Sequence, residues 1–157
     1  MKTKFFGLLL LSVLVMATSC RKGAFCVNGS GSVVADTRTV SDFKEIAIDI
    51  PATVYLNQDP NITSPVIQLE AQGNVLDEIE TYVIGDKLYV KFDRCVYGHR
   101  QITVTITFKS LEEISVNGTA HVYGNTSLNT NDFLAKINGS GSIEMDVMAN
   151  YVESRIN

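Results

Sequence analysis

Two carboxylates near the C-terminus, Glu144 and Asp146, have the residue types and the spacing of an acid–base pair. They stand two residues apart, so in an extended strand both side chains lie on the same face. Such a pair can bind a cation or serve in glycoside hydrolysis. The same spacing is more often the solvated side of a strand whose other residues, here Ile143 and Met145, point inward. We favour that interpretation.

Other chemical motifs in the chain are incomplete. Cys95 and His99 have a spacing found in zinc sites, but zinc needs about four ligands and no second pair is visible. The Gly29-Ser30-Gly31 loop resembles a phosphate loop, yet Val33-Val34 predicts a strand after it instead of a helix N-terminus. We therefore expect no catalytic residue, no metal site and no cofactor.

A short helical turn is predicted over residues 74–83, where apolar residues recur at nearly helical spacing. The acidic residues of this segment fill its other side and can be read as a cation site or as a solvated helix face. The second interpretation is the commoner one for such a run. These residues are Asp77, Glu78 and Glu80.

Length and composition fit one folded domain. The chain has 157 residues, of which 45% are hydrophobic and 19% charged, with a formal net charge of −4. Removing residues 1–19 takes away Lys2 and Lys4 but no acidic residue, so the charge of the rest falls to −6. An acidic chain without a basic run lacks the electrostatic features of a nucleic-acid or anionic-lipid binder. We expect no nucleic-acid partner.

The N-terminus resembles a bacterial lipoprotein signal. Lys2 and Lys4 precede an apolar run from Phe5 to Ala17, which is short for a membrane span, and small residues lead into Cys20. We predict a signal peptide over 1–19, lipidation of Cys20, and a lipid anchor and tether over 20–26. The alternative is an ordinary secretory signal that leaves Cys20 free.

A lipidated Cys20 would make the membrane a partner and would place the protein in the outer membrane. Arg21 and Lys22 follow directly, whereas surface-exported lipoproteins of Bacteroidetes usually carry acidic residues there. This favours the periplasmic face over the cell surface.

Two further cysteines, Cys26 and Cys95, belong to the exported part of the chain. Export exposes them to an oxidising compartment, in which a disulfide would join the start of the domain to its middle. A reduced, separated pair is the alternative, and the sequence leaves both open.

The body of the chain has the period-two pattern of half-buried strands. Ile46, Ile48 and Ile50 alternate with smaller or polar residues, and the segment 102–108 alternates four apolar residues with three threonines. The fold class predicted from this pattern is all-β.

A short repeated motif sets the rhythm of these strands. Asn28-Gly29, Asn117-Gly118 and Asn138-Gly139 are each flanked by apolar and small residues, and Ile156-Asn157 begins another copy. The last three copies are 21 and 19 residues apart. Asn and Gly accept left-handed backbone angles, so we interpret these pairs as corners between strands. Asn-Gly also favours hairpins, but a fixed period near 20 favours stacked coils, that is, a solenoid of short strands.

Residues 27 to 157 resemble the auto-transporter adhesin "head GIN" domain family, a domain of unknown function common in Bacteroidetes lipoproteins. The resemblance implies a right-handed β-helix-like solenoid in the cell envelope, and it supplies no catalytic residues. Members are usually longer, which suggests a truncated chain whose exposed C-terminal edge self-associates. The resemblance is carried by the segments 28–31, 38–48, 88–90, 102–104 and 111–118.

The leading hypothesis is a non-enzymatic, lipid-anchored envelope protein that serves adhesion or scaffolding through a solenoid surface. Its partner would be a glycan or an envelope or host-surface protein. The first alternative is a polysaccharide-active lyase or hydrolase that uses Glu144 and Asp146. The second is a glycan- or lipid-binding module, for which scattered tyrosines could supply stacking surfaces.

Overall fold

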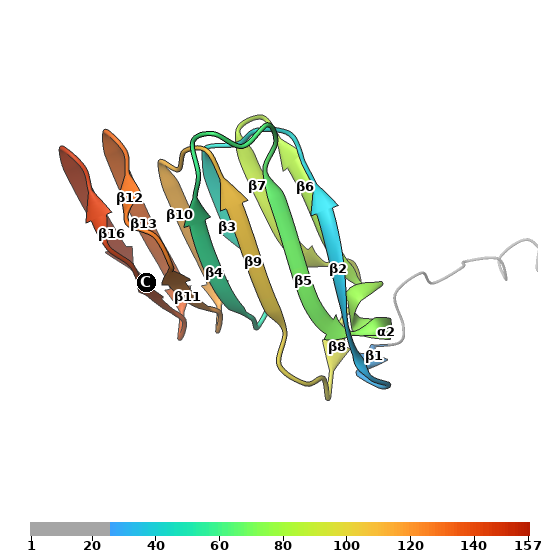
Figure 1. The fold of residues 1–157 in the computed structure, drawn as a ribbon. Coiled ribbons are helices and arrows are strands. Elements are labelled where there is room, and N and C mark those ends of the chain that lie inside the picture. Colours follow the sequence, from blue (N-terminus) through green and yellow to red (C-terminus); the bar gives the residue numbers. More distant parts are fainter. Residues whose placement is uncertain (1–25) are drawn as a thin grey trace, which may run out of the picture.

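The computed structural model describes residues 26–157, and nearly all regular structure in this range is strand (Figure 1). The strands form two six-stranded sheets and two short two-stranded pairs. In Figure 1 the strands β4, β9 and β5 lie in front of β3 and β7, so the two large sheets face each other. The one helix among the described residues is α2 (Gly73–Leu76), a single turn. The prediction of an all-β fold is confirmed.

The first sheet is parallel except at one edge, where β7 and β6 form an antiparallel pair. Across the sheet its strands are β16 (Tyr151–Ile156), β13 (Asp132–Gly139), β10 (Glu113–Gly118), β3 (Glu45–Ile48), β7 (Lys87–Phe92) and β6 (Ile79–Ile84).

The second sheet is parallel from β14 to β9 and antiparallel beyond. Across the sheet its strands are β14 (Ser142–Glu144), β11 (His121–Gly124), β4 (Thr53–Gln58), β9 (Thr103–Phe108), β5 (Val66–Gln72) and β2 (Val33–Thr39). The short pairs join β1 (Val27–Asn28) to β8 (Val96–Tyr97) and β12 (Leu128–Asn129) to β15 (Val147–Met148).

The core lies between the two sheets and follows from the alternation of the sequence. Ile46 and Ile48 of β3, and Val104 and Ile106 of β9, are all fully buried, whereas the residues between them on β9 are half-exposed threonines. Each buried aliphatic side chain of this size contributes about 1.5–3 kcal/mol relative to an exposed one. The period-two pattern thus fixes which face of each strand points inward.

The repeated motif stacks in register. Each residue of β10 lies beside a residue of β13 that comes 21 positions later, and each residue of β13 from Asp132 to Ile137 lies beside a β16 residue 19 positions later. The strands before and after each corner pair with other copies of the repeat, and not with each other. Successive copies of the repeat therefore pair side by side in parallel, and their corners are not hairpin turns.

The opposite end of the molecule is built differently. Here the pairs β2–β5, β5–β9 and β6–β7 are antiparallel. The short elements β1, β8 and α2 lie beside them at the right of Figure 1. On the edge strand β2 the Arg38 side chain points inward, donates to the backbone oxygens of Leu76 (3.2 Å) and Ile79, and pairs with Asp36. An inward-pointing charged pair of this kind protects an edge strand from pairing with another chain.

The predicted helical turn over residues 74–83 is mostly wrong. Only Gly73–Leu76 is helical, and Ile79–Ile84 is strand β6. Ile79 and Val83 pair with β7 and face the core, and this long-range pairing outweighs the weak helical spacing of the local sequence.

Candidate functional site

The asparagines of the last three copies of the motif form a ladder along one corner. Asn157 donates its side-chain amide to Asn138 (2.8 Å), and Asn138 donates to Asn117 (2.8 Å). Asn117 in turn donates to the carboxylate of Asp49, which follows β3. The ladder is exposed, and each asparagine donates a hydrogen bond to the side-chain oxygen of the next residue in it. Its role is therefore to hold neighbouring copies of the motif in register.

The corner itself is made by glycine. Gly118 and Gly139 have φ angles of 112° and 132°, and no residue other than glycine has a positive φ in the part of the chain that the structure describes. A Cβ added at Gly139 would lie 2.6 Å from the backbone oxygen of Gly118. In each of these pairs only the glycine has the positive φ, whereas Asn117 and Asn138 stay in their strands and contribute through their side chains.

The first copy of the motif lies outside this ladder. Asn28 pairs with β8 at the other end of the molecule, and Gly29 approaches the side chain of Gln72 and the backbone of His99. Asn74 closes this corner, because its amide donates to the Asn28 carbonyl (2.8 Å) and its oxygen accepts from the Ser30 amide (3.0 Å). This corner fastens the start of the domain and does not continue the coils.

Cys26 and Cys95 form a disulfide with their Cα atoms 4.5 Å apart. The bond lies beside the β1–β8 pair, where the Val27 amide also donates to the Cys95 carbonyl. Because Cys95 is used in this way, it cannot act with His99 as a thiolate metal ligand. Cys20 and the predicted signal and anchor lie outside the described residues.

Glu144 and Asp146 line a shallow hollow of about 200 Å³ together with Tyr123. Both carboxylates are exposed and neither is paired with a cation. Within residues 26–157 no group of three His, Cys, Asp or Glu side chains could hold a metal ion. The pair thus belongs to an open surface, as the wet side of its strand.

Four of the tyrosines form two stacked pairs. Tyr55 and Tyr123, on β4 and β11, have ring centroids 5.8 Å apart, and Tyr82 and Tyr89, on β6 and β7, have centroids 5.3 Å apart. The first pair follows from a second internal repeat, because segment 45–57 shares Glu, Ile, Val, Tyr and Asn with segment 113–125 at a spacing of 68 residues. This repeat is visible in the sequence but escapes a comparison limited to Asn-Gly corners.

The outer face of the first sheet is charged, and its charges neutralise one another. The Lys87 ammonium lies 2.8 Å from Glu45 and 3.2 Å from Glu113, and Lys136 lies 2.8 Å from Glu113. Burial alone would raise the pKa of Glu113, but the hydrogen bonds from Lys136 and Lys87 outweigh it and leave that pKa below its usual value. The pKa of Lys87 is raised, chiefly by its hydrogen bond to Glu45.

The outer face of the second sheet carries little charge. A row of outward residues crosses all six strands, and each member is paired in register with the next. Arg38 is the one Lys or Arg in these strands, and its guanidinium points inward. The row consists of Thr37, Gln68, Thr105, Tyr55, Tyr123 and Glu144.

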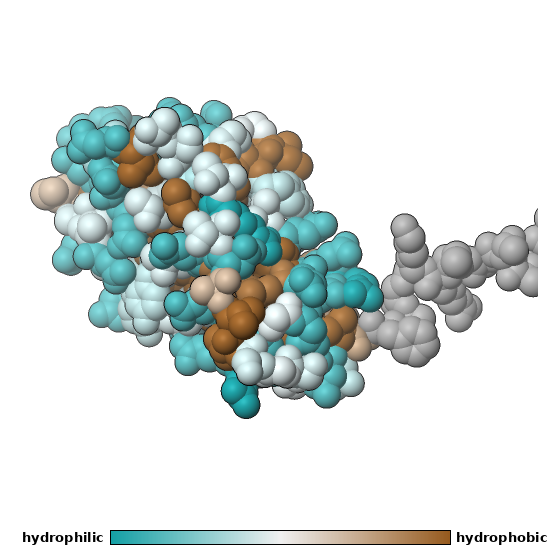
Figure 2. All heavy atoms as spheres, turned by 45° about the vertical axis from the view of Figure 1, so that its right-hand side comes forward, coloured by the Kyte–Doolittle hydropathy of each residue, from teal (hydrophilic) through white to brown (hydrophobic). Residues whose placement is uncertain are grey.

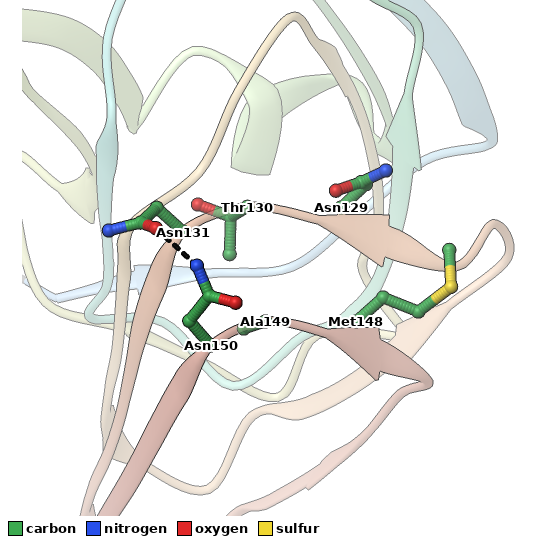
Figure 3. Close-up of a pocket in the computed structure, with 6 residues that line it drawn as sticks. All are labelled: Asn129, Thr130, Asn131, Met148, Ala149 and Asn150. Atoms are coloured by element: carbon green, nitrogen blue, oxygen red, sulfur yellow. Dashed lines mark hydrogen bonds between the residues drawn. The ribbon is translucent and has the colours of Figure 1, made fainter.

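A second hollow, of about 640 Å³, lies where β12 and β15 lead into the next strands (Figure 3). Asn131 and Asn150 meet across it, with the Asn150 amide donating to the Asn131 side chain (2.6 Å). They repeat the 19-residue spacing of the main ladder. The hollow is open and lined by short polar side chains and Met148, so the groups it offers are amides, the Thr130 hydroxyl and a thioether.

Two of the three acidic residues that the sequence places in segment 77–80 form ion pairs with neighbouring strands or loops. Glu78 is buried and binds the Arg94 guanidinium through both carboxylate oxygens, and Glu80 pairs with Lys91 at 3.1 Å. A cation site is not formed there.

No helix within the described residues is long and apolar enough to cross a membrane.

The sequence of the chain matches the model of a known protein family. The sequence model of the family described as "Putative auto-transporter adhesin, head GIN domain" matches residues 42–157. The chain belongs to this family. The resemblance expected from the sequence is confirmed, although the match begins after the corner at Asn28. No curated protein sequence matches the chain.

Solved structures share the head GIN fold at low sequence identity. A "putative adhesin" from Bacteroides fragilis has a TM-score of 0.73 at 19% identity, with 83% of this chain and 61% of that chain covered. A "putative lipid binding protein" from Parabacteroides distasonis has a TM-score of 0.71 at 15% identity, with 84% and 65% covered. A "putative adhesin" from Parabacteroides merdae has a TM-score of 0.65 at 19% identity, with 83% and 61% covered. The chain thus spans less than two thirds of the length of each.

Proposed function

We propose that this protein is a lipid-anchored protein of the outer membrane that serves adhesion or scaffolding through the surface of a right-handed β-solenoid. The observation that carries the proposal is the pair of wide, exposed sheet faces built on stacked parallel coils. Such surfaces are the usual binding areas of solenoid proteins. Membership of an adhesin-like family supports a place in the cell envelope.

The anchor is the acylated Cys20, and the basic residues after it favour the periplasmic face. Cells that make the full-length chain are expected to incorporate labelled palmitate into it, and Cys20→Ala is expected to abolish the label. Label that persists in Cys20→Ala would refute the lipidation.

Adhesion and scaffolding can be separated by cell retention on mucin-coated surfaces. If the domain is an adhesin, cells making the wild-type chain are retained more strongly than cells making Cys20→Ala at equal protein level. Equal retention would exclude adhesion to this surface and favour scaffolding inside the envelope.

A polysaccharide lyase or hydrolase is the second candidate, and Glu144 and Asp146 beside Tyr123 are the observation in its favour. Their exposure argues against acid–base work, which needs a carboxyl group with a raised pKa in a protected site. We expect no release of reducing ends or unsaturated products from pectin, mannan or mucin glycans. Turnover that Glu144→Gln abolishes would contradict the non-enzymatic proposal.

A further inference from the structure

The two sheet faces of the molecule have different chemistry. On the first sheet, lysines and glutamates already neutralise one another through short ion pairs. On the second sheet, the outward row contains two hydroxyls, one amide and two tyrosines before it ends at Glu144. The second face therefore has hydrogen-bonding and aromatic groups that are not engaged in ion pairs.

This row has the geometry of an extended ligand. It runs across the strands, so neighbouring members are about 4.8 Å apart, the strand spacing of a β-sheet. That spacing is close to the length of one sugar unit in an extended polysaccharide. Each unit along such a chain would therefore meet a new strand and a new side chain.

The tyrosine pair gives the row its strongest contact. The Tyr55 and Tyr123 rings are stacked with their planes 29° apart, and Tyr123 is 36% exposed. Aromatic rings bind the C–H faces of sugars, while hydroxyl and amide groups beside them bind the sugar hydroxyls. The hollow next to Tyr123 adds two carboxylates, Glu144 and Asp146, which can each accept hydrogen bonds from hydroxyl groups.

We propose that this row binds one chain of a neutral, extended polysaccharide, with the Tyr55–Tyr123 pair as its centre. The inference rests on the proposed function, because it names the partner of the solenoid surface. The lack of positive charge on the outer face of the second sheet favours a neutral ligand over an acidic one. The strands supply no outward Lys or Arg to neutralise a uronate or a sulfate, and Glu144 would repel one.

An anionic membrane fits this face less well. The six strands of the second sheet carry no outward Lys or Arg to bind lipid phosphates. In the view of Figure 2 the exposed apolar residues form small separate patches among polar ones instead of one continuous surface.

Affinity electrophoresis tests the inference with full-length protein purified in detergent. The gels contain hydroxyethylcellulose or galactomannan as neutral polysaccharides with extended β-1,4-linked backbones, and polygalacturonate or dextran sulfate as acidic ones. We expect retardation by at least one neutral polysaccharide that does not weaken when salt is raised. The Tyr55→Ala/Tyr123→Ala variant should bind about tenfold more weakly.

The matched control is Tyr82→Ala/Tyr89→Ala, which removes the stacked pair of the first sheet and should leave binding unchanged. Near-identical thermal unfolding of the two variants shows that a loss of binding is not a loss of folding. Binding only to acidic polysaccharides, binding to none, or an equal loss in both variants would overturn the inference. If palmitate labelling depends on Cys20 while no polysaccharide binds, this inference fails and the proposed anchored protein stands; if the label persists in Cys20→Ala and no polysaccharide binds, both fail.

Discussion

At the residue scale, glycine and asparagine have separate duties at the coil corners. Gly139 supplies the positive φ and the close approach to Gly118, while Asn138 joins two neighbouring copies through its amide. The Asn-Gly pair of the repeat is thus one side-chain requirement followed by one backbone requirement, a division of roles that the sequence alone does not separate.

Replacing Gly139 by alanine should destabilise the domain. The new Cβ would combine an unfavourable φ with a 2.6 Å contact to the Gly118 oxygen, at a cost of about 2 kcal/mol or more. Gly85→Ala is the matched control, because Gly85 also has a positive φ (61°) but open space around its Cα, so strain alone costs about 1 kcal/mol. Urea unfolding compares the two. Equal losses would contradict the steric role of Gly139.

Glu113 should contribute stability that depends on pH. Its carboxyl group accepts hydrogen bonds from Lys87 and Lys136, and its folded-state pKa is below the usual glutamate value. The contribution is therefore present above the unfolded-state pKa and is lost as the pH falls through the lower folded-state value. Glu113→Gln should cost about 1–2 kcal/mol near pH 7, and the difference from wild type should shrink in acid.

Chemical unfolding of both proteins across pH 3–7 checks this expectation. Glu112→Gln is the control, because its exposed partner Lys44 gives a pair that solvent screens, and its effect should be smaller. A Glu113→Gln penalty that stays constant down to pH 3 would contradict the assigned ionisation.

At the element scale, the disulfide joins the residues that directly precede β1 and β8. Cys26 and Cys95 are 69 residues apart in sequence, so the bond closes a long loop. Cys26→Ser should lower the free energy of unfolding of the oxidised protein by about 2–4 kcal/mol. Denaturant unfolding with and without a reductant measures it. Identical midpoints under both conditions would show that the bond contributes nothing to stability.

The edge strand β16 should make this 157-residue chain self-associate. Val152 and Ile156 are 54% and 75% exposed, and they continue inward-facing columns that begin at the buried Phe133 and at Ile137. A strand edge with exposed apolar groups can pair with another chain. Sedimentation velocity of Ile156→Lys should show self-association weakened by about tenfold, equivalent to about 1.4 kcal/mol.

Ile84→Lys is the control for that experiment, because Ile84 is also largely exposed (65%) but points outward at the far edge of the first sheet. If both variants associate alike, or if the wild-type chain is a monomer at every concentration, the β16 edge is not an interface.

The elements could be predicted from the sequence to different degrees. The period-two pattern located buried strands such as β3 and β9, and the 19–21-residue spacing gave the register of β10, β13 and β16. Strand β6 was mistaken for helix because its local spacing is ambiguous, and only its pairing with β7 decides. Local patterns cannot contain that long-range partner.

Side-chain sites were harder to predict than strands. The Asn ladder follows from the repeat, but its first member, Asp49, is an acid 68 residues from Asn117. The Tyr55–Tyr123 stack is separated by the same 68 residues, because the segment holding β5 to β9 lies between two copies of one coil. A repeat interrupted in this way is found in the sequence only when segments 68 residues apart are compared with each other.

At the scale of the whole molecule, the two ends and the two faces differ. Antiparallel strands and the disulfide close the end at which the described residues begin, and parallel strands extend to β16 at the other end (Figure 1). The first face is self-neutralised and the second is available for hydrogen bonding. This arrangement fits a domain that is fixed at one end and binds along its side.

Membrane fractionation of cells that make the full-length chain tests the central claim, an anchored envelope protein, most directly. We predict that the wild-type chain sediments with the outer membrane and stays there after a high-salt wash, whereas Cys20→Ala appears in the soluble periplasmic fraction. A wild-type chain in the soluble fraction, or a Cys20→Ala chain that remains in the outer membrane, would contradict the account.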